Sequence, residues 1–205
     1  MIDIESLVSS FIVLWAVIDP VGTIPVFIAV TKNYGEEEKK RIALVSSVVA
    51  FLILLFFLVI GEILLRRMGV PLPAFQVSGG VVLLIFALDM IFGNSKPEGE
   101  IQLLKSAQET AVFPLAIPSI AGPGAILAVI LLTDNSRHSL VDQGITAALM
   151  ALMILITYFF MRIAGPINRK IGNSGAIVIS KVMGLILASI AATNILIGIK
   201  EFFKL

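Results

Sequence analysis

Residues 18–31 read I-D-P-V-G-T-I-P-V-F-I-A-V-T, and residues 120–133 read I-A-G-P-G-A-I-L-A-V-I-L-L-T. The two stretches lie 102 positions apart (120 − 18), align without a gap, and each place proline and glycine inside a long apolar run. Because lipid cannot satisfy free backbone N–H and C=O groups, a helix broken at membrane depth must face protein or a water-filled cavity. Two broken segments in matching halves of a chain therefore point to the binding site of a transporter. The identical pairs are Ile18/Ile120, Gly22/Gly124, Ile24/Ile126, Ile28/Ile130 and Thr31/Thr133.

The composition is that of a membrane protein with several spans. Hydrophobic residues make up 58% of the 205 residues, charged residues make up 14%, and the mean hydropathy is +1.04. Soluble domains carry about 25% charged residues, so the sequence predicts a single transmembrane domain over residues 1–205. The first apolar run is too long for the core of a signal peptide and follows no basic segment, so we expect it to be the first span.

The sequence also disfavours several classes of function. The net charge of +1 offers no basic face to a nucleic acid. The chain has no cysteine, which excludes disulfides, thiol catalysis and thiolate-bound metals. It has no P-loop for ATP and no base beside Ser119 that would make a nucleophile. We therefore expect no enzyme, no metal and no cofactor.

Six apolar runs approach the roughly 20 residues that cross a bilayer core. Short polar segments separate them, and the longest of these, residues 94–110, is the expected linker between two halves. We therefore predict an all-α membrane protein with six transmembrane helices. The runs are Leu7–Val30, Ile42–Leu65, Phe75–Phe92, Ala111–Leu132, Leu140–Ile163 and Ala176–Ile199.

The similarity between the halves extends beyond the broken segments. The sequence R-R-M-G at 66–69 resembles R-K-I-G at 169–172, and three later pairs align at a nearly equal offset. Each half contains three spans, an odd number, so the second half enters the membrane from the opposite side. The sequence thus predicts two inverted three-helix repeats, about 1–93 and about 111–205, with broken first and fourth helices. The later pairs are Gly79/Gly184, Asp89/Asn194 and Gly93/Gly198.

Lysine and arginine in the loops predict the orientation. Cytoplasmic loops carry an excess of these residues. One side of the predicted topology has nine of them and the other side has five, so we expect the nine-residue side to be cytoplasmic and both termini to lie outside. The first set is Lys32, Lys39, Lys40, Arg41, Lys96, Lys105, Arg162, Arg169 and Lys170, and the second is Arg66, Arg67, Arg137, Lys200 and Lys204.

The first break centres on Asp19, twelve residues after Leu7 and close to mid-membrane. An Asp followed by Pro is typical of a helix start, because the Asp side chain accepts backbone N–H bonds and Pro needs no acceptor at the first helical position. We therefore expect a second half-helix to begin near Pro20. Gly22 would let another group approach the backbone, and Pro25 would add a kink.

The second break has a different chemistry. Pro114 and Pro118 interrupt the entry half, and G-P-G at 122–124 restarts the helix with Pro123 at its first position. Ala121 aligns with Asp19, so the second break lacks a carboxylate, and Ser119 is its nearest polar side chain.

The two half-helix N-termini would meet near the midplane from opposite sides. Each brings unpaired N–H groups and about half a positive charge, an arrangement that binds carboxylates. Asp19 and the freed carbonyls would hold an ammonium group or a coupling cation, so the site suits a small zwitterion. The predicted site residues are Asp19, Pro20, Gly22, Thr23, Pro25, Pro118, Ser119, Gly122, Pro123 and Gly124.

Plainer interpretations of the same residues remain open. The prolines and glycines would then only kink the helices, and Asp19 would only cap one. Asp89 and Asn194 join Asp19 as candidates for coupling, since polar groups inside spans are functional candidates by default. However, Asp89 lies where it can reach interfacial water, and Asn194 can bridge to another helix.

Other polar groups in the spans have simpler interpretations. Glu62 precedes Arg66 by four residues and should form an ion pair with it. Gln76 is expected to be solvated or to cap the third span, and the pair Gly79-Gly80 and Gly184 should allow close packing of helices.

The stretch I-D-P-V-G-T-I-P-V-F, with P-L-A-I-P-S-I-A-G-P-G-A-I at 114–126, resembles the MarC family of integral membrane proteins over essentially the whole chain. Within that family the chain is similar to the SnatA type, which are transporters of glycine and alanine thought to be coupled to a proton gradient. The resemblance implies uptake of small neutral amino acids across the inner membrane of a prokaryotic cell. It also implies that the residues around the two breaks form the site.

We therefore expect a secondary transporter in which one repeat rocks against the other. An exporter of another small metabolite or a drug would have the same fold. A passive channel for a small solute would need a continuous polar stripe, which the sequence does not supply. A membrane assembly factor without transport is the third alternative. No motif requires an oligomer, although a homodimer is compatible with a chain this small.

Overall fold

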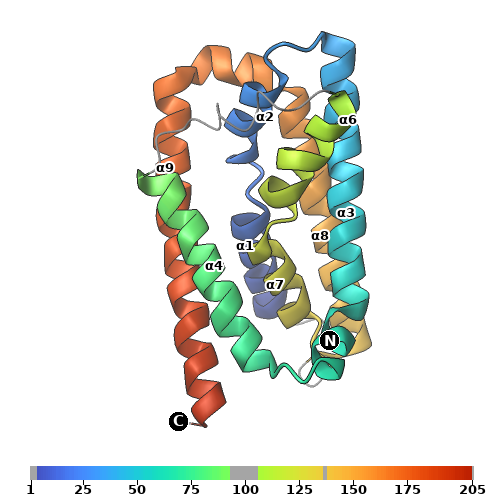
Figure 1. Cartoon of the computed structure of the whole chain (residues 1–205), viewed down its shortest axis with the longest axis vertical. Coiled ribbons are helices and arrows are strands. Elements are labelled where there is room, and N and C mark those ends of the chain that lie inside the picture. Colours follow the sequence, from blue (N-terminus) through green and yellow to red (C-terminus); the bar gives the residue numbers. More distant parts are fainter. Residues whose placement is uncertain (1–3, 93–105, 136–137, 205) are drawn as a thin grey trace.

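A computed structural model describes residues 4–92, 106–135 and 138–204, and all regular structure in these ranges is helical (Figure 1). The helices pack around one centre, and an irregular helix, η1, connects α6 to α7. In order, the elements are α1 (Ile4–Ile18), α2 (Thr23–Thr31), α3 (Glu36–Arg67), α4 (Leu72–Phe92), α6 (Ala107–Thr110), η1 (Ala111–Ile120), α7 (Pro123–Leu132), α8 (Leu140–Arg162) and α9 (Ala164–Phe203).

The predicted class, an all-α membrane protein with several spans, is confirmed. Five described segments are long and apolar enough to cross a membrane, and the first of them joins α1 and α2 as Ile4–Thr31. The pair Ala107–Ile120 and Pro123–Leu132, which bends by 55°, makes a sixth if it is counted as one span. The linker predicted at 94–110 lies outside the described residues, except for its last five positions.

The two broken spans run in opposite directions. In Figure 1, α1 lies below α2, whereas η1 lies above α7. The two chain ends lie at the same end of the molecule, as an even number of crossings requires. We call this end the termini face and the other end the far face.

One predicted boundary is wrong. Residues 165–175 were expected to be a polar link, but α9 is helical from Ala164 onward. Pro166 is the third residue of this helix, and the first-turn N–H groups have no acceptor within a helix, so a proline there removes no hydrogen bond. Figure 1 shows the first part of α9 crossing the far face before the helix turns down beside α4.

Helices α4 and α9 pack closely and antiparallel through glycines, as expected for Gly80 and Gly184. A Cβ on Gly80 would lie 3.1 Å from the Ala191 carbonyl oxygen, and one on Gly184 would lie 3.0 Å from the Ala87 oxygen. Neither helix could carry a larger side chain there without moving the other helix's backbone.

A polar bridge crosses the same pair. Gln76 Nε2 donates to Asn194 Oδ1 over 3.4 Å, which confirms the predicted bridging role of Asn194. The expectation that Gln76 is solvated or capping is wrong, because Gln76 is buried. A buried amide needs a partner, and Asn194 on the facing helix supplies it.

The broken spans occupy the centre of the bundle. Nearly every residue of α7 from Gly124 to Ile130 is buried, and Leu14, Ile18, Leu115 and Ile120 are fully buried. The longer helices α3, α4, α8 and α9 instead expose large apolar side chains on their outer faces, as a protein surrounded by lipid tails would. The breaks are therefore held by protein and not by lipid.

Candidate binding site at the two helix breaks

The first break is a sharp turn at Asp19. Helix α1 continues as far as the Asp19 N–H, which donates to the Trp15 oxygen over 3.1 Å. Asp19 then adopts a φ of +47°, a left-handed conformation that Asp tolerates better than most residues. Its carbonyl oxygen accepts from the Thr23 N–H at 3.1 Å and from Thr23 Oγ1 at 3.0 Å. The chain thus changes direction over four residues while its backbone remains hydrogen-bonded.

The Asp19 side chain caps this turn as predicted. Its Oδ1 accepts from the Gly22 N–H over 2.9 Å, three residues along, as at a helix N-terminus. Regular α2 begins at Thr23 with Gly22 before it, and not near Pro20 as predicted, because residues 20–22 still belong to the turn. The prediction that the Asp19 side chain accepts a backbone N–H at this restart is confirmed, which leaves its second oxygen to be explained.

Gly22 makes room for the carboxylate. A Cβ built on Gly22 would lie 1.9 Å from Asp19 Oδ2, far inside any allowed contact. The sequence predicted that some group approaches the backbone at Gly22, and the structure identifies that group as the side chain of Asp19.

The second carboxylate oxygen of Asp19 is without a donor. Asp19 is only 5% exposed, and the Gly22 N–H is the one hydrogen-bond donor that the described residues offer its side chain. Every fully buried side-chain N or O atom in the described chain has a partner. Oδ2 must therefore border a gap that water can reach, and it is available to a ligand.

The second break restarts as predicted from G-P-G. Gly122 is extended, with φ −76° and ψ 169°, and Pro123 takes the first position of α7. The Ile126 N–H donates to the Gly122 oxygen at 3.0 Å, which closes the first turn. No side chain caps α7, so its first N–H groups keep their full capacity for an anion.

Close contacts surround the glycines of this break too, with the backbone at Gly122 and with a leucine side chain at Gly124. A Cβ on Gly122 would lie 2.5 Å from the Pro118 oxygen, and one on Gly124 would lie 2.5 Å from Leu83 Cδ1. Leu83 of α4 was not predicted, since nothing in the sequence shows which helix would cover the break.

The two breaks face each other. Ser119 Oγ lies 3.5 Å from Thr23 Oγ1, and α2 packs against η1. Thr23 Oγ1 is itself bonded to the backbone carbonyl oxygen of Asp19, so polar contacts connect the Asp19 turn to Ser119 at the second break. Most of the predicted site residues therefore come together near the middle of the bundle (Figure 1).

Three predicted residues lie apart from these contacts. Pro25 is half-buried within the first turn of α2, past the turn that forms the break. Asp89 is exposed on α4, and Asn194 is bonded to Gln76 between α4 and α9. Among the described residues, no hydrogen bond or ion pair joins Asp89 or Asn194 to Asp19.

The half-helices that leave the breaks end alike. Thr31 Oγ1 donates to the Phe27 oxygen and Thr133 Oγ1 to the Val129 oxygen, each over 2.6 Å. These threonines are the last identical pair of the two repeated stretches, and both are buried. The sequence similarity is thus matched by the same local bond in both halves.

Comparison with known proteins assigns the family. The model of the "MarC family integral membrane protein" matches residues 4–203. The chain is 35% identical over 208 residues to a "UPF0056 membrane protein" of Bacillus subtilis, covering 96% of this chain and 95% of that one. It is 34% identical over 208 residues to one of Aquifex aeolicus, with coverage of 96% and 94%. A third, from Methanocaldococcus jannaschii, is 32% identical over 201 residues, with coverage of 97% and 98%.

No solved structure matches the chain. The family match spans both breaks and every described span, and the relatives are matched over almost their whole length. The chain is therefore an integral, multi-pass membrane protein that belongs to the MarC family.

Proposed function

We propose that this protein is a secondary transporter of small neutral amino acids, with glycine and alanine as its substrates. The observation that carries the proposal is the contact between Thr23 and Ser119, which unites the two breaks. In support of it, the first break contains an unpartnered carboxylate oxygen and the second contains a helix N-terminus without a side-chain cap. A zwitterion presents the two charges that complement these groups.

The structure refines the role of each break. Asp19 already accepts the Gly22 N–H, so the start of α2 is largely neutralised and is a poor site for an anion. The substrate carboxylate would instead bind the first N–H groups of α7. The substrate ammonium, or a coupling proton or cation, would bind Asp19 Oδ2, and an ammonium–carboxylate hydrogen bond is among the stronger kinds.

The residue types at the breaks favour a small substrate. Gly22, Gly122 and Gly124 have no side chain, and Thr23 and Ser119 have short polar ones. A site lined by such residues would be tight and mildly polar, so it would admit a hydrogen or methyl side chain and reject a bulky one.

The opposed directions of the broken spans and the matching threonines support an inverted repeat. Alternating access would then come from one repeat rocking against the other. The excess of lysine and arginine that the sequence gives to the loops on one side supports an orientation in a prokaryotic inner membrane with both termini outside.

The test is uptake of radiolabelled glycine and alanine into proteoliposomes, with and without an inward proton gradient. We expect gradient-stimulated uptake that Asp19→Asn abolishes. Asp89→Asn is the matched control, because it neutralises a carboxylate that is exposed on α4, and it should transport at the wild-type rate.

Two results would overturn the proposal. Folded wild-type protein that takes up neither amino acid under any gradient would leave an exporter of another solute, a channel or an assembly factor. If uptake were lost in Asp89→Asn but kept in Asp19→Asn, the carboxylate required for transport would be Asp89 on α4 and not Asp19 at the breaks.

A further inference from the structure

A second buried carboxylate joins the two halves of the chain at the termini face. Glu62, near the end of α3, is 9% exposed. Its Oε1 pairs with Arg66 Nη2, which confirms the predicted i,i+4 pair. Its Oε2 accepts from the Asn135 N–H at 2.8 Å and from Asn135 Nδ2 at 2.6 Å. We call Glu62, Arg66 and Asn135 the Glu62 clamp, and it connects α3 to the turn that follows α7.

Helices α3 and α7 are in close contact beside the clamp. A Cβ on Gly61 would lie 2.6 Å from Ile130 Cγ1, and Thr133 Oγ1 donates to the Leu58 oxygen at 3.2 Å. Both contacts lie within one helical turn of Glu62. The clamp therefore closes one end of a tight seam between the halves.

The seam continues to the second break along α4. A Cβ on Gly79 would lie 2.8 Å from Leu127 Cδ2, and the Gly124–Leu83 contact follows one turn nearer the break. Helix α7 thus packs against α3 and α4 along its length, from the clamp to the proposed substrate site. Movement of α7 away from these two helices would open a route from the clamp to that site.

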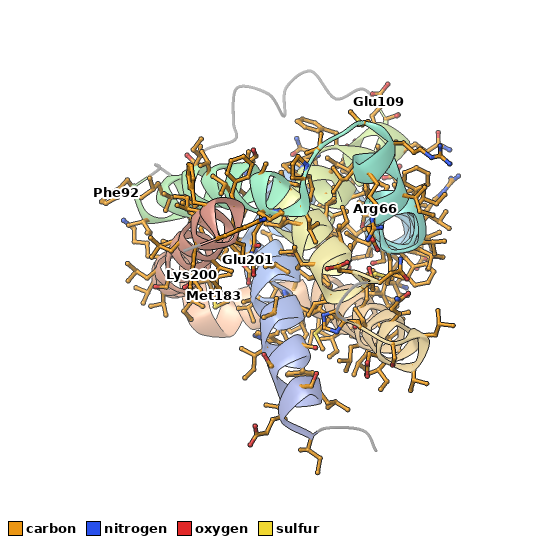
Figure 2. All side chains as sticks on the ribbon, turned by 90° about the horizontal axis from the view of Figure 1, so that it is seen from below. Arg66, Phe92, Glu109, Met183, Lys200 and Glu201 are labelled. Carbon is orange, nitrogen blue, oxygen red and sulfur yellow. The ribbon has the colours of Figure 1, made fainter. Side chains whose placement is uncertain are left out.

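A cavity of about 280 Å³ reaches the clamp from the termini face. It is lined by Glu62, Arg66, Asp134 and the 70–73 turn between α3 and α4. Figure 2, which views this face, shows Arg66 at the end of α3 and Lys200 at the end of α9 on opposite sides of α1. Water and solutes on this side can therefore approach the clamp while the seam beyond it remains closed.

A different contact joins the two halves at the far face. Tyr34 Oη and Thr110 Oγ1 lie 3.0 Å apart and join the turn after α2 to the start of the second half. That contact is neutral, whereas the contact at the termini face contains a buried charge. Loss of a donor to a buried carboxylate costs more than loss of a neutral hydrogen bond.

We infer that the Glu62 clamp is the gate on the termini face, and that it closes the route along α7 to the helix breaks. This inference rests on the proposed function, because a gate requires a transport site behind it. Opening requires that the hydrogen bonds between Asn135 and Glu62 break. Arg66 and water in the cavity would then stabilise the charge of Glu62.

The absence of cysteine in the native chain makes the gate directly testable. Ser119→Cys places one thiol at the breaks, and its rate of reaction with a small membrane-impermeant thiol reagent is measured from each side of sealed vesicles. We expect Asn135→Ala, and Glu62→Gln as a milder variant, to accelerate labelling from the termini side about tenfold, the factor that one hydrogen bond to a charged group is worth. Glu37→Gln is the matched control, since it removes an exposed ion pair with Lys40 on the same helix.

A wild-type labelling rate in both clamp variants would overturn the inference. Acceleration that is equal from both sides would also overturn it, since it would indicate a loosened fold. This measurement uses no substrate, so it stands even if glycine and alanine are not transported. A second test uses the double variant Glu62→Cys/Asn135→Cys, in which a disulfide would lock the gate. We expect uptake to be lost on oxidation and regained on reduction. Undiminished uptake by the oxidised protein would contradict the gate but not the proposed transport function.

Discussion

The two side-chain oxygens of Asp19 have different surroundings, and the proposed function gives them different roles. One oxygen holds the turn by accepting the Gly22 N–H, and the other borders a gap without a donor. A cap alone would be served equally well by Asn, whose side-chain oxygen accepts the same bond. A ligand for a cation needs the charge, so the two roles respond differently to substitution.

We therefore expect Asp19→Asn to keep the stability of the wild type and lose transport, and Asp19→Ala to lose transport together with part of the stability. Removal of a cap by Ala costs about 1 kcal/mol of stability. Thermal unfolding of the purified protein, followed by the fluorescence of its lone tryptophan, Trp15, measures the stability. Equal destabilisation by Asn and Ala would show that the charge itself holds the turn.

Gly22→Ala tests the same turn from the other side. The new methyl group would overlap Asp19 Oδ2 at 1.9 Å, so the carboxylate must move, and we expect a loss of about 1–3 kcal/mol as for other overpacked sites. The loss should be smaller in an Asp19→Ala background, because the two positions are in direct contact. Additive losses in the double variant would contradict the contact.

Gly144→Ala is the control for that experiment. Gly144 lies on α8 with nothing within 4 Å of an added Cβ, and Ala is the better helix former by up to about 1 kcal/mol. Stability should therefore stay the same or rise.

At the scale of the helices, the pairing of α4 with α9 depends on backbone contact. Gly184→Ala would place a methyl group 3.0 Å from the Ala87 oxygen, and a carbonyl cannot move aside as a flexible side chain can. We expect a lower unfolding temperature than for Gly165→Ala, which lies on the same helix with open space around it. Equal unfolding temperatures would mean that the two helices separate readily.

The helix breaks could be predicted from the residues at the breaks themselves. Contacts between residues far apart in the sequence could not be predicted. Pro and Gly act on their own backbone, so Asp19-Pro20 and G-P-G at 122–124 indicated both restarts. Glu62 and Arg66 are four residues apart and were paired correctly. Asn135, which completes that clamp, is 73 residues from Glu62. Nothing in the residues around Asn135 indicates that it would contact Glu62. Gln76 was misjudged for the same reason, because its partner is on another helix.

At the scale of the whole molecule, the two termini share one face and the turn after α2 lies at the other (Figure 1). In right-side-out cell membranes, single cysteines at Lys32 and Ser139 should therefore react with an impermeant thiol reagent from opposite sides. The lysine and arginine distribution predicts that the cysteine at Ser139 is reached from outside. Labelling of both from one side would contradict the arrangement of the spans.

The short half-helices have a consequence for how thick a barrier the solute meets. Helix α2 has nine residues and α7 has ten, so at 1.5 Å per residue each is about 14–15 Å long, half of a bilayer core of roughly 30 Å. The breaks thus lie about halfway across the membrane, with one half-helix on either side of them. If the protein is the transporter proposed above, a solute bound at the breaks would be separated from either compartment by only about half of the bilayer thickness, and small displacements would be enough to expose it to one compartment or the other.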